Sequence, residues 1–427
     1  MTAFLAFPPV GSVGGVVRVP ASKSATNRAL VLSAMGTTEV DIVRPLESDD
    51  TRCLRRCLEA MGAVFRETQE GLAVHGPLGG RGDREVVLDA GDSGTAARFL
   101  AAVAAATPGR YLLTGSERLK QRPMGELVAA LSSIGAAISF GGVEGALPLD
   151  IRGGSLRSGR VEVDASRSSQ FVSALLIAGI AIEGGLEIEP RGPVVSAPYV
   201  RTTLETLAAF GHRVVPGAVL RSSRGATPVD RYAPPGDYSS GVPLLAAAGV
   251  AGGFVTVLGL PWPSHDADAL ALPALEGAGL LLRRVSGGLA AVGERGKLAP
   301  LTVTATNFPD AVPALAALAA LAPGESVIAG IGHLRLKESD RVEALAEVLE
   351  KAGARVVAGE DRLVVVGPAQ GVSGGLVRLP TFGDHRIAMA AGLLSLALPG
   401  LLIESPDCVA KSYPGFFRDL ESIARRS

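Results

Sequence analysis

Lysine and arginine residues recur in short polar loops of this chain, and their number suggests chemistry on an anion. Four loop regions carry eight cations, which are Lys23 and Arg28, Arg98 and Arg122, Lys337 and Arg341, and Arg386 and Lys411. Lysine and arginine are the side chains that bind phosphate and carboxylate groups. Because desolvating so many cations without a ligand would be unfavourable, we expect the site to be open until anions bind.

Each polar loop stands between a β-type run and a helix, and this unit recurs about every 70 residues. The six loops are Ser22-Lys23-Ser24, Asp92-Ser93-Gly94, Ser168-Ser169-Gln170, Ser239-Ser240-Gly241, Asn307 to Asp310, and Asp384-His385-Arg386. Serine, aspartate and asparagine are the residues that cap helix N-termini. Free N–H groups and the helix dipole favour anions there, so helices that begin at a common face would form an anion site.

The helices that follow the loops are of two kinds. Five of the six first helices are almost wholly apolar, as in Phe171 to Ile182, and such helices are buried. Each repeat then has an amphipathic helix, at Asp50 to Met61, Pro123 to Ile134, Tyr199 to Phe210, Ala267 to Ala278, Asp340 to Ala352 and Pro414 to Arg425. The first five end at a glycine, the expected residue after a helix.

These six units predict an α/β protein of two domains with three units each, in which parallel helices are buried and the sheets lie outside. A chain of 427 residues with 47% hydrophobic content is long enough for two cores. The Pro234-Pro235-Gly236 stretch lies between the third and fourth loops and is the expected crossover. We expect domains 1–20 plus 237–427 and 21–236, with the active site in the cleft between them. The first strand could pair in either domain.

Composition excludes several classes of partner. The net charge of −1 and the 4% aromatic content argue against nucleic-acid binding. Three cysteines without zinc-ligand spacing indicate a cytoplasmic protein with no metal or other cofactor. No basic residue precedes Arg18, so no targeting peptide is expected. The uncharged stretch from Tyr238 to Ser264 is interrupted by glycine and proline, which argues against a membrane span. A monomer is expected.

The loops together resemble the enolpyruvyl transferase family, most closely its 3-phosphoshikimate branch, along nearly the whole chain. The ordered series of matches is more specific than any one of them. It comprises Ser22-Lys23-Ser24 with Asn27-Arg28, Ser93-Gly94-Thr95 with Arg98, Arg122-Pro123, Ser168-Ser169-Gln170-Phe171, Ser196 and Tyr199, Asn307 with Pro309-Asp310, Leu336 to Arg341, Asp384 to Met389, and Ala410-Lys411.

The resemblance implies two substrates, shikimate 3-phosphate and phosphoenolpyruvate, and an inside-out fold of six βα units. Carried over by position, the shikimate 3-phosphate ligands are Lys23, Ser24, Arg28, Ser168, Ser169, Gln170, Ser196, Asp310 and Lys337. The phosphoenolpyruvate ligands are Lys23, Gly94, Arg122, Gln170, Arg341, His385, Arg386 and Lys411. Arg341, Arg386 and Lys411 would belong to the domain formed by residues 1–20 and 237–427.

The implied reaction needs a base for the attacking hydroxyl, an acid for the methylene carbon and cations for phosphate. Asp310 and Glu338 are the best carboxylate pair, because each lies beside cation-rich positions. We assign Asp310 to the hydroxyl proton and Glu338 to the carbon, with Lys23 stabilising charge and, as an alternative, sharing in proton transfer. The two carboxylates could exchange roles.

Asp92 departs from the family, which often has asparagine there. A carboxylate about 4 Å from a phosphate charge costs on the order of 4 kcal/mol at an effective dielectric of 20. Asp92 should therefore pair with a cation, take up a proton or turn away. The fourth loop, Gly236-Asp237-Tyr238-Ser239-Ser240, carries no cation and is interpreted as structural.

Two other functions compete with this interpretation. The first is UDP-N-acetylglucosamine enolpyruvyl transferase, which usually has a reactive cysteine in the loop matching Gly115 to Arg122, where this chain has none. The second is a non-catalytic relative that binds anions. Lys23, Asp310 and Glu338 argue against it.

Overall fold

The computed structural model describes residues 3–7, 10–79, 84–225, 229–371 and 375–425. The chain divides into two compact units. Unit 1 combines Met1–Pro20 with Pro235–Ser427, and unit 2 is Ala21–Pro234. The chain passes from unit 1 to unit 2 after Pro20 and returns to unit 1 after Pro234. The sequence predicted this return two residues later, after residue 236.

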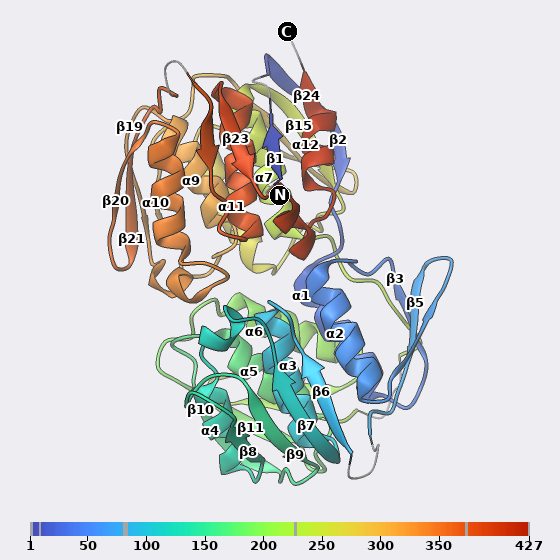
Figure 1. Cartoon of the computed structure of the whole chain (residues 1–427). Helices are drawn as coiled ribbons and strands as arrows, with labels where there is room; N and C mark the ends of the chain where they lie inside the picture. The colour runs from blue at the N-terminus through green and yellow to red at the C-terminus, as the bar shows by residue number, and fades with distance from the viewer. Residues whose placement is uncertain (1–2, 8–9, 80–83, 226–228, 372–374, 426–427) are drawn as a thin grey trace. The chain divides into compact units, whose positions relative to one another are not determined.

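Unit 2 contains three repeats of strands and helices (Figure 1). Its described helices are α1 (Lys23–Met35), α2 (Asp49–Ala60), α3 (Gly94–Ala106), the 3-10 turn η1 (Leu119–Gln121), α4 (Gly125–Ser133), α5 (Ser169–Gly179) and α6 (Pro198–Ala209). Its described strands are β3 (Val40–Val43), β4 (Val64–Glu67), β5 (Gly71–His75), β6 (Glu85–Asp89), β7 (Gly109–Thr114), β8 (Ala137–Phe140), β9 (Leu149–Gly153), β10 (Gly159–Asp164), β11 (Leu186–Arg191), β12 (Arg213–Val215), β13 (Leu220–Ser223) and β14 (Arg231–Tyr232).

Unit 1 repeats the pattern. Its described helices are α7 (Tyr238–Ala251), η2 (Ala267–Ala271), α8 (Leu272–Gly277), α9 (Val312–Leu321), η3 (Gly332–Leu336), α10 (Arg341–Lys351), α11 (His385–Ala397), η4 (Pro406–Lys411) and α12 (Phe416–Ile423). Its described strands are β1 (Phe4–Ala6), β2 (Ser12–Arg18), β15 (Gly253–Leu258), β16 (Leu281–Val285), β17 (Gly288–Gly293), β18 (Thr302–Thr304), β19 (Gly324–Ala329), β20 (Arg355–Ala358), β21 (Arg362–Gly367), β22 (Val377–Leu379), β23 (Leu401–Glu404) and β24 (Ala424–Arg425).

The sheets share one plan, which confirms the repeat. In the order β6-β7-β9-β8, the first pair is parallel and the other pairs are antiparallel. The orders β10-β11-β13-β12, β14-β3-β5-β4 and β18-β19-β21-β20 follow the same plan. The remaining sheets of the described chain are β16-β17-β15-β2-β24 and β1-β23-β22.

Two strands each pair within their own unit but lead along the chain into a helix of the other unit. Strand β2 leads along the chain into α1 of unit 2, but it pairs in parallel with β15 of unit 1. Strand β14 leads into α7 of unit 1, but it pairs in parallel with β3 of unit 2. These pairings answer the question of the first strand, which the sequence left open: β2 belongs to the sheet of unit 1.

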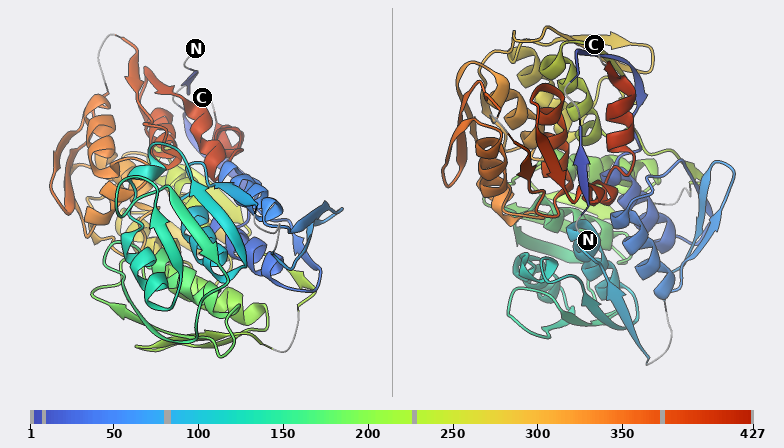
Figure 2. Two further views of the ribbon diagram at one scale, coloured as in Figure 1. Left: turned by 60° about the horizontal axis from the view of Figure 1, so that its bottom comes forward. Right: turned by 45° about the horizontal axis from the view of Figure 1, so that its top comes forward.

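The apolar helices lie inside each unit, as the sequence predicts. Every residue of α7 is buried, as are nearly all residues of α3 and α11. In unit 1, α7, α9 and α11 pack on one another, and strands β19 to β21 lie outside α9 and α10 (Figure 1). In unit 2, the sheet of β6 to β9 lies over α3 (Figure 2, left).

The ends of the helices also follow the expected chemistry. Gly62, Gly135, Gly211, Gly279 and Gly353 all have positive φ. That conformation suits glycine because it has no Cβ. Among the described residues, we find no helix with the length and apolar character that a membrane span requires.

Candidate active site

Arg341, the first residue of α10, joins three carboxylates in unit 1. Its Nη1 donates to Asp310 Oδ1 at 2.7 Å and its Nη2 donates to Glu338 Oε2 at 3.0 Å. Its Nε donates to Asp384 Oδ2 at 2.7 Å. The side chain is only 1% exposed. Burial lowers the pKa of Arg341, but Asp384, Asp310 and Glu338 together raise it well above its ordinary value, so the guanidinium stays charged.

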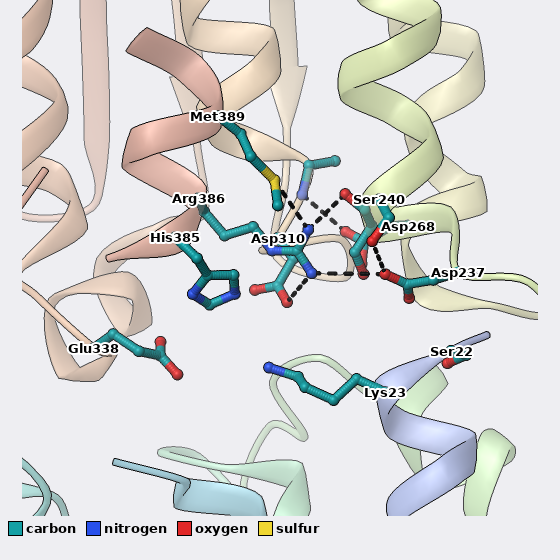
Figure 3. A network of polar contacts seen from close by, with 12 residues as sticks. Ser22, Lys23, Asp237, Ser240, Asp268, Asp310, Glu338, His385, Arg386 and Met389 are labelled. Atoms are coloured by element: carbon teal, nitrogen blue, oxygen red, sulfur yellow. Dashed lines mark hydrogen bonds and ion pairs between the residues drawn. The ribbon is translucent and has the colours of Figure 1, made fainter. Parts of the chain in front are cut away.

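Arg386, the second residue of α11, shares Asp310 with Arg341. Figure 3 shows the contacts of Arg386 with Asp310 and its neighbours. Its Nη2 lies 3.4 Å from Asp310 Oδ2, and its Nη1 donates to the Ser239 carbonyl at 2.7 Å. Asp237 Oδ2 lies 3.9 Å from Nη2. Burial lowers the pKa of Arg386, but Asp310 and other nearby carboxylates raise it above the ordinary value. One carboxylate therefore bridges two buried cations.

Helix N-termini position these groups. Asp340 caps α10 by accepting from the amides of Val342 and Glu343, each at 3.2 Å. Asp384 caps α11 by accepting from the Arg386 amide at 2.9 Å. Asp384 thus has two functions, because the same carboxylate also binds the side chain of Arg341. The sequence marked Asp384 only as a capping residue.

The other predicted residues of unit 1 come from the same segments. His385 is fully buried, with Nδ1 3.6 Å from Asp384 Oδ1. Lys337 follows η3, and Lys411 ends η4 as a buried residue. Their roles as ligands stay predictions.

The fourth loop, interpreted from the sequence as structural, takes part in this network. Asp237 and the Ser239 carbonyl both face Arg386. The loop has no cation of its own but supplies acceptors to a cation from another repeat. Only tertiary contacts reveal this, because Asp237 and Arg386 are far apart in sequence.

A further aspartate lies near this loop. Burial, together with the neighbouring Asp268, Asp237 and Asp310, raises the pKa of Asp266 well above its ordinary value. Despite these acids, the described residues contain no cluster of His, Cys, Asp or Glu side chains that could hold a metal ion.

In unit 2, Lys23 begins α1 and forms an ion pair with Asp50 of α2. Its Nζ lies 3.2 Å from Asp50 Oδ2, and the two side chains are 12% and 5% exposed. Ser22 caps the helix. Asp50 was not among the predicted site residues, because sequence placed it only at the start of an amphipathic helix.

Gly94, Arg98, Arg122 and Gln170 meet where α3 and α5 begin. Arg98 Nη1 donates to Gln170 Oε1 at 3.2 Å, and Gln170 Nε2 donates to Thr95 Oγ1 at 3.0 Å. A Cβ on Gly94 would lie 2.3 Å from Arg98 Nη1 and 2.6 Å from Arg122 Nη1. Because Gly94 has no side chain, the two guanidinium groups can lie this close to the backbone.

Arg28 makes several contacts within unit 2. It donates to Thr203 Oγ1 at 2.8 Å, to the Ser24 carbonyl at 2.8 Å and to the Tyr199 carbonyl at 3.0 Å. It also lies over the Phe99 ring. These contacts hold α1 to α6, and a role in binding substrate stays a prediction.

The serines of unit 2 differ in their surroundings. Ser168 caps α5 by accepting from the Gln170 amide at 3.2 Å, and Ser169 is buried. Ser196 has φ of 54°, and within the described part of the chain its buried Oγ has no hydrogen-bond partner. A buried hydroxyl in this state suits a ligand that brings its own polar group.

Asp92 accepts a short hydrogen bond from the Ser116 hydroxyl. Ser116 Oγ also accepts from the Leu119 amide at 3.2 Å, at the start of η1. Asp92 therefore connects the loop before α3 to the turn that leads to Arg122.

Comparison with known proteins identifies the family. The family model for EPSP synthase (3-phosphoshikimate 1-carboxyvinyltransferase) matches residues 8–420. The 3-phosphoshikimate 1-carboxyvinyltransferase of Methanoculleus marisnigri is 38% identical over 96% of this chain and 97% of its own length. That of Sulfurovum sp. is 35% identical over 97% and 98% of the two chains.

Solved structures agree with the sequence matches. EPSP synthase from Acinetobacter baumannii has a TM-score of 0.81 and 25% identity, covering 100% of this chain and 99% of that one. An enolpyruvyl transferase from Streptomyces tendae, 19% identical with a TM-score of 0.76 over 99% and 97% of the chains, shares the fold. These matches support the 3-phosphoshikimate branch and not the UDP-N-acetylglucosamine alternative. The chain belongs to the EPSP synthase family of enzymes, which transfer the enolpyruvyl group of phosphoenolpyruvate to shikimate 3-phosphate in the biosynthesis of chorismate and aromatic amino acids.

Proposed function

We propose that Asp310, Glu338 and Lys23 perform the proton transfers and charge stabilisation of this reaction. The main support is that Asp310 and Glu338 converge on one buried guanidinium, that of Arg341. In this proposal Asp310 accepts the proton of the 5-hydroxyl as its oxygen attacks C2 of phosphoenolpyruvate. Glu338 delivers a proton to the methylene carbon. In the elimination that follows, Glu338, now an anion, takes a proton back from the methyl carbon as phosphate leaves the tetrahedral intermediate, which restores the C2–C3 double bond. Lys23 stabilises the charge that develops.

Arg341 gives a physical reason why Glu338 would take up its proton only after phosphoenolpyruvate binds. Asp310 and Glu338 bind the guanidinium of Arg341 as anions. In that state neither carboxylate carries a proton that it could donate. The carboxylate of phosphoenolpyruvate would compete for the same guanidinium and weaken its hold on Glu338. Glu338 could then take up the proton that it passes to carbon.

The proposed ligands of each substrate come from both units. For shikimate 3-phosphate, Lys23, Ser24, Arg28, Ser168, Ser169, Gln170 and Ser196 belong to unit 2, and Asp310 and Lys337 belong to unit 1. For phosphoenolpyruvate, Lys23, Gly94, Arg122 and Gln170 belong to unit 2, and Arg341, His385, Arg386 and Lys411 belong to unit 1. Two observations support these assignments: the buried Ser196 hydroxyl has no hydrogen-bond partner among the described residues, and two guanidinium groups lie close to Gly94.

The first test is phosphate release from phosphoenolpyruvate without added metal. We expect release with shikimate 3-phosphate and none with UDP-N-acetylglucosamine. Release with neither acceptor would favour the non-catalytic alternative for this chain.

The carboxylate roles are tested with Asp310→Asn and Glu338→Gln. Each should lower kcat by about 10²- to 10⁴-fold, the usual value of a general acid or base. In D2O, Glu338→Gln should also slow deuterium entry into the methylene carbon more than Asp310→Asn does. The reverse order would exchange the roles. The matched control is Glu343→Gln. Glu343 is an exposed carboxylate on α10 that pairs with Arg335, so its replacement should leave turnover normal.

We also propose that the protein is a cytoplasmic monomer. The cysteines Cys53, Cys57 and Cys408 are all free, as a reducing compartment requires. Light scattering after size exclusion should give the mass of one chain, and cell fractionation should place the protein with cytoplasmic enzymes. A dimer mass or a membrane-bound fraction would contradict the respective statement.

A further inference from the structure

Asp268 is a buried carboxylate in the short turn η2, and none of the roles assigned above includes it. It is 0% exposed. Its Oδ2 accepts from the Ser239 hydroxyl at 2.7 Å, and its Oδ1 accepts from the Ala311 amide at 2.9 Å. These donors come from α7 and from the residue that precedes α9. Burying an anion is costly, so its contacts require an explanation beyond the cap of a short turn.

The first donor belongs to a residue that holds Arg386, and the second belongs to the residue that directly follows one. The carbonyl of Ser239 accepts from Arg386 Nη1 at 2.7 Å. Asp310, which precedes Ala311, has its Oδ2 3.4 Å from Arg386 Nη2. Asp268 therefore binds Ser239 and Ala311, which belong to or directly follow the residues that hold Arg386, and its charge also helps to raise the pKa of Arg386.

We propose that Asp268 is a positioning residue that fixes the Ser239 carbonyl and the Asp310–Ala311 peptide on either side of Arg386. This inference rests on the proposed roles of Asp310 and Arg386. The network that it orders is drawn in Figure 3, where Asp268, Asp310 and Arg386 are labelled. Since positioned groups lose rate when they shift by fractions of an ångström, the effect should appear in kinetics as well as in stability.

The decisive measurement is a double-mutant cycle on kcat/KM for phosphoenolpyruvate. Asp268→Asn keeps the shape but offers an amide N–H to one of the two donors. We expect it to lower kcat/KM about 10- to 100-fold. Because it acts through Arg386, it should cause less than a 3-fold further loss in an Arg386→Lys background. If the double variant lost kcat/KM by the product of the two single-variant losses, the two residues would act independently and the proposal would be overturned.

Ser326→Ala is the matched control. Ser326 is also fully buried in unit 1 and its Oγ accepts from the Leu301 amide at 2.9 Å, between β18 and β19. It should lower the melting temperature without changing kcat/KM by more than 2-fold. If Asp268→Asn behaves like this control, its role is structural and the proposal fails.

Ser239→Ala keeps the test decisive should Asp268→Asn fail to fold. It removes the hydroxyl that binds Asp268 but keeps the carbonyl that binds Arg386. We expect a 3- to 10-fold loss of kcat/KM that is again non-additive with Arg386→Lys, and an unchanged value would overturn the proposal. The proposed function is tested separately: it fails if Asp310→Asn retains normal turnover. If Asp310→Asn is inactive but Asp268→Asn has normal kcat/KM, only the inference about Asp268 fails.

Discussion

Arg341 is the single cation that binds the two carboxylates proposed to be catalytic, and Asp384 with them. Asp310, Glu338 and Asp384 belong to three different loops, and their side chains converge because each contacts the same buried guanidinium. A planar group with five donors can satisfy several carboxylates at once, which a lysine ammonium cannot do with the same geometry. Replacement of Arg341 by lysine should therefore be far from conservative.

Asp92 gives a prediction at the level of one residue. Its carboxylate binds the Ser116 hydroxyl, and it stands next to the loop that contains Gly94. If its charge repels the phosphate of phosphoenolpyruvate, Asp92→Asn should tighten binding and lower the KM for phosphoenolpyruvate several-fold. Steady-state kinetics and calorimetry would measure this. An unchanged or weaker affinity would show that the bond to Ser116 already removes the repulsion, and Ser116→Ala should then weaken binding.

At the scale of elements, the repeated helix N-termini bring the polar residues to defined places. Each buried helix begins at a short polar loop, so its first turn presents amide groups and a partial positive charge. The outer helices have a different function, because they add partners to the inner ones. For example, α2 supplies Asp50 to Lys23 at the start of α1.

The N-terminus of α2 provides a stability prediction. Ser48 and Thr51 form a reciprocal capping box, and Ser48 is fully buried. Ser48→Ala should lower the free energy of unfolding by about 1 kcal/mol, the usual value of an N-cap serine. Urea denaturation would measure the change. Ser422→Ala, on the exposed side of α12, should change stability by less than about 0.5 kcal/mol. Equal effects of the two would contradict a capping role.

His212, which precedes β12, provides a prediction about pH. Burial and the nearby Arg224 lower the pKa of His212 to about 4, from 6.5. The unfolded chain therefore binds more protons between these values, so stability is complete above pH 6.5 and falls as the pH drops toward 4. His212→Gln should reduce this fall in melting temperature. Identical pH profiles for the two proteins would show that His212 is not held neutral. His333, whose pKa is also about 4, remains in both.

In the whole molecule, the chain passes from one unit to the other shortly after β2 and again shortly after β14. Strand β2 lies between β15 and β24 in a sheet of unit 1, although it is separated in sequence from the rest of that unit. Strand β14 is the last described strand of the continuous segment Ala21–Pro234 and completes a sheet within it. Each unit has its own hydrophobic core.

This arrangement predicts different behaviour for two fragments. Residues 21–234 contain all the strands of unit 2 and should fold alone with a cooperative thermal transition. Residues 235–427 lack β2, which leaves two strand edges unpaired, and should not fold until residues 1–20 are supplied. Circular dichroism and calorimetry of the fragments, with and without the 1–20 peptide, would measure this. Cooperative unfolding of 235–427 alone would contradict the role of β2.

Local elements and the set of charged residues could be predicted from the amino-acid order alone. Periodicity, capping residues and terminal glycines predicted the buried helices and the outer helices, because these features depend on neighbours within a few residues. The series of loop motifs also predicted the family, which the comparisons confirmed.

The pairing of the charged side chains, in contrast, became visible only in the folded chain. Asp384 looked like a cap and the Asp237 loop looked structural, yet they bind Arg341 and approach Arg386 through contacts between repeats. Asp50 and Asp268 were missed for the same reason, since their partners lie on other elements. Strand β2 could have paired in either unit, because its pattern is satisfied by any parallel neighbour. Pairing between distant segments depends on the packing of the whole core, and no local pattern encodes it.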